Sequence, residues 1–153
     1  MPGHWVLARL GKRVLRPGGM QLTRRLLEAL RIESTDEVVE FAPGMGITAR
    51  LTLELRPASY TAVERDEAAA TIVRSYLKGE RQRCVVGNAS DTGLPDQCAT
   101  VVYGEAMLTM QTEEVKRQIV HEAHRLLKSG GRYGIHEMCL MAENLDENTK
   151  RKC

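Results

Sequence analysis

Paired cysteines, long apolar runs, aromatic residues and net charge are all scarce in this 153-residue sequence. Four cysteines stand far apart without a CxxC pair, which argues against a disulfide framework or a structural zinc site and predicts reduced thiols (Cys84, Cys98, Cys139, Cys153). No stretch approaches the roughly 18 apolar residues that a membrane helix needs. Because 22 basic residues nearly balance 20 acidic ones, charge gives no reason to expect a nucleic-acid partner.

The length fits one domain with a real hydrophobic core. We expect this domain to span residues 1–141, with residues 1–20 as an N-terminal lid and residues 142–153 as a polar tail. The run from Trp5 to Ala8 is too short for the core of a signal peptide. We therefore expect a cytoplasmic protein without a membrane segment.

Short β-branched runs alternate with helical periodicities, which is typical of βαβ units on a parallel sheet. The pattern predicts strands over residues 37–42, 59–64, 83–87, 98–103 and 133–141. It predicts helices near residues 20–31, 49–55, 69–77 and 115–127, with Asp66 as an N-cap and Ser129–Gly131 as a glycine C-cap. The expected fold is α/β, a doubly wound and mostly parallel sheet whose ligands bind beyond the carboxyl ends of the strands.

A glycine-containing loop follows the first predicted strand. Gly44 through Ala49 satisfies the GxGxxA pattern, in which the absence of Cβ atoms lets a ligand approach the backbone. Glu64 lies 64 − 46 = 18 residues after Gly46, close to the spacing of a carboxylate that holds ribose hydroxyls. The loop therefore predicts a nucleoside cofactor.

Glu40 distinguishes between the possible cofactors. It stands four residues before Gly44, where its charge would repel the pyrophosphate of NAD. A ligand with an amino group and a sulfonium, such as S-adenosylmethionine, suits an acidic strand end instead.

These residues resemble the motifs of the class I S-adenosylmethionine-dependent methyltransferases, in particular the small-molecule, type 11-like group. Glu40 to Gly46 resembles the family's acidic residue and GxGxG loop, with Ala42 in place of the first glycine and Pro43 after it. The resemblance implies that Glu64 and Arg65 form the ribose element, and that Asn88 and Ala89 read the adenine edge. Two further segments agree, Leu94–Asp96 before the fourth strand and Leu126–Arg132 before the fifth.

The family's sheet usually has two more strands after the fifth, the last one antiparallel. The resemblance therefore implies a Rossmann-like methyltransferase fold that lacks its last two strands here. We expect a homodimer as one way to cover the open sheet edge, since an unpaired edge is normally protected.

Candidate acceptor-side residues follow the fourth strand and lie in the fifth. In the family, the position of Glu105 often lies beside the methionine moiety, although a solvated loop carboxylate is an equal alternative. His136 and Glu137 point to opposite faces of the predicted strand, so one of them can reach an acceptor. His136 can act as a general base near neutral pH, or it can be a hydrogen-bonded histidine beneath a helix. The Asn-Pro-Pro element of enzymes that methylate adenine or glutamine amides is absent after the fourth strand.

Two further motifs have competing interpretations. Gly18 and Gly19 beside Arg16 fit a loop over the cofactor with an anion clamp, or a plain turn. His121 and His124 are three residues apart where a zinc-protease helix needs four, so we interpret them as a solvated helix face.

Three functions are compatible with these residues. The first is methyl transfer from S-adenosylmethionine to a small molecule by in-line displacement. The second is an NAD-linked oxidoreductase, which Glu40 disfavours. The third is a non-catalytic, cofactor- or partner-binding domain of truncated methyltransferase type.

Overall fold

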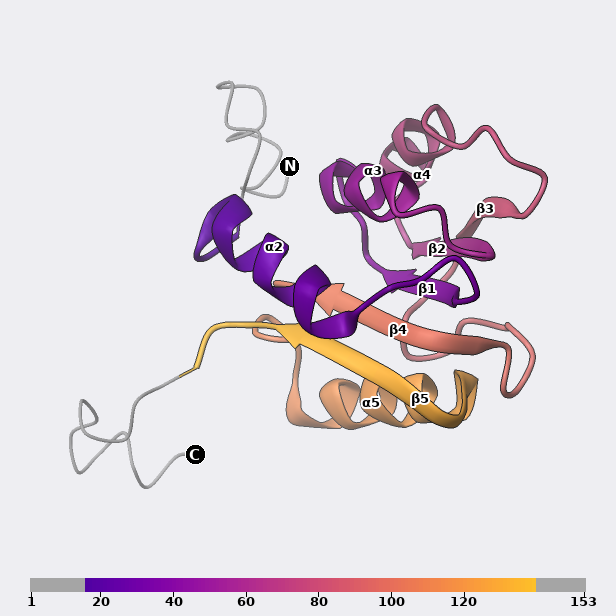
Figure 1. Cartoon of the computed structure of the whole chain (residues 1–153). Coiled ribbons are helices and arrows are strands. Elements are labelled where there is room, and N and C mark those ends of the chain that lie inside the picture. The colour runs from indigo at the N-terminus through magenta and orange to yellow at the C-terminus, as the bar shows by residue number, and fades with distance from the viewer. Residues whose placement is uncertain (1–15, 140–153) are drawn as a thin grey trace, which may run out of the picture.

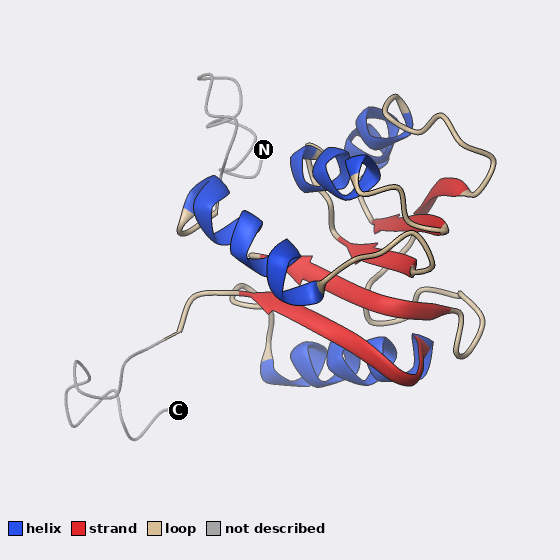
Figure 2. Ribbon diagram, in the orientation of Figure 1, coloured by secondary structure: helices blue, strands red, loops and turns tan. Residues whose placement is uncertain are grey.

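The computed structural model describes residues 16–139, which form one five-stranded sheet flanked by helices (Figures 1 and 2). All four strand pairs are parallel, and the order across the sheet is β3-β2-β1-β4-β5. The strands are β1 (Glu37–Phe41), β2 (Ser59–Glu64), β3 (Gln82–Val86), β4 (Ala99–Glu105) and β5 (Leu127–His136). The predicted α/β class and doubly wound parallel sheet are confirmed.

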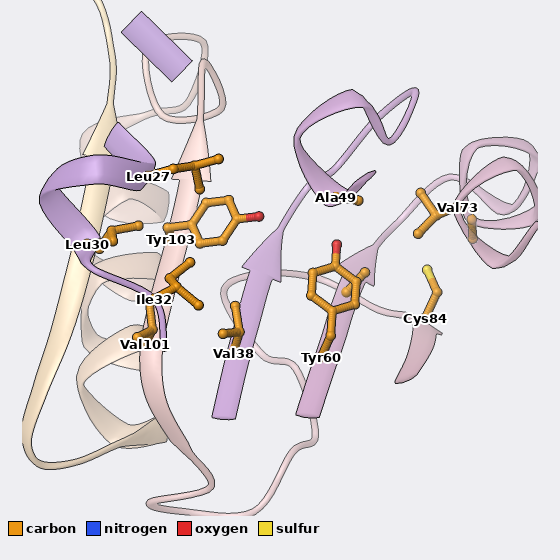
Figure 3. Packing of buried hydrophobic residues seen from close by; sticks show 12 residues of the cluster. Leu27, Leu30, Ile32, Val38, Ala49, Tyr60, Val73, Cys84, Val101 and Tyr103 are labelled. Carbon is orange, nitrogen blue, oxygen red and sulfur yellow. The ribbon is translucent and has the colours of Figure 1, made fainter. Parts of the chain in front are cut away.

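The helices form two unequal layers on the sheet (Figure 1). One face carries α2 (Gly19–Leu30), α3 (Ile47–Glu54) and α4 (Glu67–Arg74), while α5 (Glu113–Leu126) covers the other face below β4 and β5. Each layer has its own apolar core. The first includes Leu27, Leu30 and Tyr103 (Figure 3), and the second includes Ile119 and Leu126. Burial of these side chains is the main favourable contribution to folding.

The chain order of the strands reverses between β1 and β4. In a doubly wound sheet this reversal opens a crevice at the carboxyl ends, because the connections leave toward opposite faces. Both strands end there in a left-handed residue, Ala42 with φ 50° and Ala106 with φ 50°. The switch point therefore lies between Glu40 and Glu105, two of the predicted site residues.

Most predicted elements agree with the structure within two residues, but the junction of α5 and β5 does not. The predicted glycine C-cap at Ser129–Gly131 is wrong, because α5 ends at Leu126 and Leu127 already has extended backbone angles. The glycines instead lie inside β5, where the register jumps from Ala99↔Leu127 to Val101↔Arg132. Gly130 has φ 77°, and a Cβ on Gly131 would lie 2.9 Å from the Lys128 carbonyl oxygen. A bulge in the strand, rather than the end of a helix, is what requires glycine here.

Other predicted boundaries shift as well. The fifth strand begins six residues earlier than Tyr133 and ends at His136, and the fourth extends to Glu105. The Asp66 N-cap is confirmed, since its carboxylate accepts a hydrogen bond from the amide of Ala69 at 2.9 Å. Residues 1–15 of the predicted lid, and the predicted tail over 142–153, lie outside the described residues.

Within residues 16–139 the sheet ends at β3 on one side and at β5 on the other. No helix in this range is long and apolar enough to cross a membrane. The homodimer across the β5 edge stays a prediction.

The bulge gives a direct test of this fold. Gly131→Ala should lower the free energy of unfolding by about 1–3 kcal/mol, because the added Cβ meets two backbone carbonyls that cannot move independently. Gly130→Asn is the matched control, since that site is open and asparagine tolerates a left-handed backbone. Urea unfolding of both variants measures the difference, and equal stability would contradict the bulge.

Candidate functional site

Four residues form a row across the carboxyl ends of β2, β1, β4 and β5. Phe41 pairs with both Val63 and Gly104, so Ala42 continues the row between Glu64 and Glu105. Glu105 in turn pairs with His136. Because alternate residues of a strand share a face, Glu40 lies one step below this row on the same side of the sheet.

The glycine loop leaves β1 above this row. Gly44 and Gly46 have φ of 55° and 74°, the left-handed region that glycine tolerates best. A Cβ on Gly44 would meet no atom within 4 Å, whereas one on Gly46 would lie 2.7 Å from the Tyr76 ring. Gly44 therefore borders open space and Gly46 is needed for packing of the loop against α4. The Gly46 amide also donates to the Pro43 carbonyl at 2.9 Å, which closes the turn.

Glu64 ends β2 beside this loop and is buried. Its Oε2 accepts from the Gly44 amide at 3.0 Å, and its Oε1 accepts from the Asp66 amide at 3.1 Å. The carboxylate thus fixes the loop and the start of α4 at once. The ribose role of Glu64 stays a prediction.

The other predicted residues of the nucleoside side differ in exposure. Arg65 and Asn88 are exposed and Ala89 is buried. The Asn88 Oδ1 accepts from the Ser90 amide at 3.2 Å and from its hydroxyl at 3.0 Å. The oxygen that we expected to accept from adenine is therefore already used in a local turn.

The Glu105 carboxylate has partners from four separate segments of the chain. Oε1 accepts from the Thr48 hydroxyl at 2.6 Å, and Oε2 accepts from the Thr23 hydroxyl at 2.7 Å. Arg16 Nε lies 3.1 Å from Oε2. Burial by itself would raise the pKa of Glu105, but these donors and His136 outweigh it and hold the pKa below its usual value. Glu105 is therefore a buried carboxylate and not a solvated loop residue.

His136 packs beside Glu105 and is 8% exposed. Its Nδ1 lies 2.8 Å from Glu105 Oε2. Its Nε2 is buried without a hydrogen-bond partner among the described residues. A carboxylate at Nδ1 favours the tautomer with the proton there, which leaves a lone pair on Nε2.

Glu137 lies on the opposite side of the strand end from His136. Its carboxylate accepts from the amides of Met107, Leu108 and Thr109 at 2.7, 2.7 and 3.2 Å. The Thr109 hydroxyl donates to it at 2.7 Å. Glu137 thus anchors the β4–α5 loop, and the structure separates it from the Glu105–His136 pair.

Glu40 lies at the centre of a buried polar group. The hydroxyls of Tyr60 and Tyr103 both donate to its Oε2, the latter at 2.7 Å. The Thr52 hydroxyl extends this series of hydrogen bonds, because it lies 2.7 Å from the Tyr103 hydroxyl. Burial raises the pKa of Glu40 to about 7 against the opposing effect of the two hydroxyls, and the nearby Glu105 adds to the rise.

The segment before α2 reaches this site through Arg16. Gly18 caps the helix with φ 71°, and a Cβ there would clash with Leu22 at 2.0 Å. The Gly19 amide donates to the Arg16 carbonyl at 3.2 Å, which turns the chain so that Arg16 faces Glu105. Arg16 therefore holds a carboxylate of this chain, whereas the sequence suggested a clamp for a bound anion.

The sequence motifs assign no role to four site residues, although one of them, Thr48, lies within the Gly44–Ala49 pattern (Thr23, Thr48, Tyr60 and Tyr103). The tyrosines read as ordinary strand residues and the threonines as helix residues. A signal did exist, because Tyr60 and Thr48 share strand or helix faces with apolar core residues, where an unpartnered hydroxyl is costly.

No group of three or more His, Cys, Asp or Glu residues within 16–139 is arranged to hold a metal ion. His121 and His124 lie on α5, where they line a shallow surface hollow with Lys116, Arg117 and Val120.

The buried Glu40 predicts an unusual pH dependence of stability. Its pKa of about 7 in the folded chain exceeds the value of 4.5 for a free glutamate, so folding favours its protonated form. This contribution is present at acidic pH and is lost as pH rises toward and through 7. Glu40→Gln should therefore stabilise the chain at pH 8 by on the order of 1–3 kcal/mol and change it little near pH 5.

Urea unfolding across pH 5–8 measures this effect. Glu33→Gln, which removes an exposed carboxylate, is the control. A stability difference for Glu40→Gln that stays constant with pH would mean that Glu40 is ionised throughout.

The comparisons with known proteins agree with this geometry. Residues 39–135 match the methyltransferase domain family. An uncharacterised protein of Haemophilus influenzae is 33% identical over 146 residues, which is 93% of this chain and 58% of the relative. The chain thus spans less than two thirds of the length of the curated relative that it matches.

Solved structures show the same fold at low sequence identity. A methyltransferase-like protein of Bacillus halodurans superposes with a TM-score of 0.66 at 20% identity, over 74% of this chain and 49% of that one. An S-adenosylmethionine-dependent methyltransferase of Mesorhizobium loti gives 0.65 at 18% identity, over 73% and 50%. The (4+2)-cyclase SpnF gives 0.67 at 20% identity, over 76% and 44%.

The switch-point site, the glycine loop and the matched domain lead to one conclusion. The chain belongs to the methyltransferase domain family, and it shares the fold of a solved S-adenosylmethionine-dependent methyltransferase.

Proposed function

We propose that this chain binds S-adenosylmethionine at the carboxyl ends of β1, β2 and β4 and supports methyl transfer to a small-molecule acceptor. One observation carries the proposal. Three buried carboxylates, Glu40, Glu64 and Glu105, surround a glycine loop that borders open space at the switch point. Acidic groups in this arrangement favour a nucleoside with cationic groups and disfavour a pyrophosphate.

The residues present fit such a cofactor. Glu64 would accept from the ribose hydroxyls, and Gly44 leaves the space that a ligand against the loop requires. Glu40 has a second oxygen, Oε1, that no hydrogen bond from the described residues reaches. That oxygen would face a cationic amino group. Asn88 would contribute through its amide NH2, because its oxygen is engaged by Ser90.

The acceptor side centres on His136 and Glu105. S-adenosylmethionine supplies an electrophilic methyl carbon on a sulfonium leaving group. Glu105 holds the imidazole through Nδ1, and Nε2 would take the proton that an acceptor hydroxyl, amine or thiol loses. Since Nε2 is buried, an acceptor would reach it only after the residues that cover this atom move.

The same burial favours a second candidate function. The Nε2 atom of His136 is buried, and the chain covers 58% of the length of its relative. Both observations are compatible with a domain that binds the cofactor and leaves catalysis to a segment outside this chain. Cofactor affinity and methyl transfer therefore need separate measurements.

Calorimetric titration with S-adenosylhomocysteine tests the cofactor site, with NAD as the negative control. We expect micromolar binding of S-adenosylhomocysteine alone. Glu64→Ala should weaken it by roughly 1–3 kcal/mol, the cost of losing a charged hydrogen-bond acceptor. Glu67→Ala, which removes an exposed carboxylate on α4, should leave it unchanged. Equal affinities for both variants would remove Glu64 from the ribose site.

Transfer of a labelled methyl group tests the acceptor side. The probe is labelled S-adenosylmethionine with a panel of small hydroxyl, amine and thiol compounds, with RNA and peptide as contrasting acceptors. His136→Asn keeps a donor near the Nδ1 position and removes Nε2, so transfer should fall by about 10²–10⁴-fold while S-adenosylhomocysteine affinity stays the same. Full transfer by this variant would exclude His136 as the base, and labelling of RNA or peptide alone would overturn the small-molecule acceptor.

A further inference from the structure

We propose that Glu40 is protonated in the ligand-free site and releases this proton to solvent when the ligand's ammonium group arrives. The proposal rests on the cofactor site proposed above. It adds a chemical event at that site, namely the ionisation of a buried carboxyl.

The geometry around Glu40 disfavours a permanent negative charge. The side chain is 3% exposed, and both hydrogen bonds that it accepts come from neutral hydroxyls. Figure 3 shows Tyr60 and Tyr103 on the strands that flank the one carrying Val38, with the Tyr60 hydroxyl toward the carboxyl end of its strand and the Tyr103 hydroxyl toward the central strand. Two neutral donors offset only part of the cost of burying a carboxylate.

No cation within the described residues is available to Glu40 alone. Arg16 is the positive group that acts on it, and its Nε is 3.1 Å from Glu105 and 2.6 Å from the Thr23 hydroxyl. Glu105 itself is a like charge. Four groups act on Glu40 directly: Tyr60 from β2, Tyr103 and Glu105 from β4, and Arg16 before α2. Four others interact with these groups in turn: Thr48 and Thr52 from α3, Cys84 from β3 and His136 from β5.

Neither tyrosine competes with Glu40 for this role. Burial raises the pKa of both Tyr60 and Tyr103 well above 10, and the neighbouring Glu40 raises them further. Both hydroxyls therefore keep their protons at every physiological pH. They stay donors to Glu40 whether it is ionised or neutral.

An ammonium group changes this balance because it supplies the missing opposite charge. Glu40 Oε1 accepts no hydrogen bond from the described residues, and Glu40 lies near the end of the strand that leads into the open glycine loop. A cation placed there favours the carboxylate by Coulomb attraction in a poorly hydrated setting. The O–H bond of Glu40 breaks, its electron pair stays on the carboxylate, and the proton passes to water. Nothing is oxidised or reduced.

The pKa of about 7 for Glu40 places this event in an accessible range. Near pH 6 most ligand-free chains carry the proton, so binding should release about one proton, and near pH 8 it should release almost none. For the same reason the affinity for an ammonium-bearing ligand should rise about tenfold from pH 6 to pH 8. A ligand without an ammonium group should show neither effect.

The experiment titrates the full chain with S-adenosylhomocysteine in buffers of different ionisation enthalpy, from pH 6 to pH 8. The dependence of the binding enthalpy on the buffer gives the number of protons released. The control ligand is 5′-methylthioadenosine, which keeps the nucleoside and the thioether but has no ammonium group. The test variant is Glu40→Gln. Tyr60→Phe and Tyr103→Phe provide a second test, because loss of a donor to the carboxylate should move the proton release to higher pH.

Support consists of proton release with S-adenosylhomocysteine, none with 5′-methylthioadenosine, and loss of the release in Glu40→Gln. If Glu40→Gln does not fold, the pH displacement in the two phenylalanine variants decides the question in its place. Tight binding without proton release overturns the inference and leaves the cofactor site intact. Proton release that persists in Glu40→Gln overturns it too, by assigning the proton to another group. Absence of any S-adenosylhomocysteine binding overturns the proposed function, and the inference with it.

Discussion

The carboxylate of Glu105 joins four segments that are distant in the sequence. Arg16 and Thr23 come from the segment before α2 and from α2 itself, Thr48 comes from α3, and His136 ends β5. Without this charge, two threonine hydroxyls, a guanidinium and an imidazole would converge on a buried point with no acceptor, and unpartnered buried polar groups are costly. The seating of α2 over the switch point depends on this one side chain as much as on the apolar contacts of Leu27 and Leu30.

The site as a whole gathers three carboxylates at the carboxyl ends of β1, β2 and β4, and the protein offsets their repulsion in three different ways. Backbone amides at the loop and at the start of α4 hold Glu64. An arginine, a histidine and two hydroxyls hold Glu105. Glu40 accepts hydrogen bonds from two neutral tyrosine hydroxyls, and burial raises its pKa to about 7. A site that leaves one acidic group undercompensated is less stable than it could be, and functional sites commonly carry such a cost.

Sequence patterns were sufficient for the sheet and for much of the nucleoside side. Short β-branched runs indicated all five strands of the described residues, because burial on both faces of a parallel sheet selects such runs, although the fifth strand begins six residues before its predicted start. They failed at Ser129–Gly131, since a glycine pair after an amphipathic helix fits a C-cap and a strand bulge equally well, and only the pairing with β4 distinguishes them. They also failed for Glu137, because the three amides that it anchors belong to a loop 28–30 residues earlier in the chain. Partners of this kind are set by tertiary structure and leave no local signal.

Solved structures of low sequence identity share the sheet of this chain but differ in the reaction that their names give. A methyltransferase and a (4+2)-cyclase superpose on this chain with nearly equal TM-scores, so the sheet and its switch point do not specify the reaction. In this chain three places border the switch point: the residue that follows β4, the last residue of β5 and the segment before α2. The Ala106 amide donates to the His136 carbonyl at 2.8 Å, His136 Nδ1 lies 2.8 Å from Glu105 Oε2, and Arg16 forms an ion pair with the same oxygen. The acceptor role of the Glu105 cluster and the ligand-binding roles of Glu40 and Glu64 therefore rest on the proposed function and not on the fold.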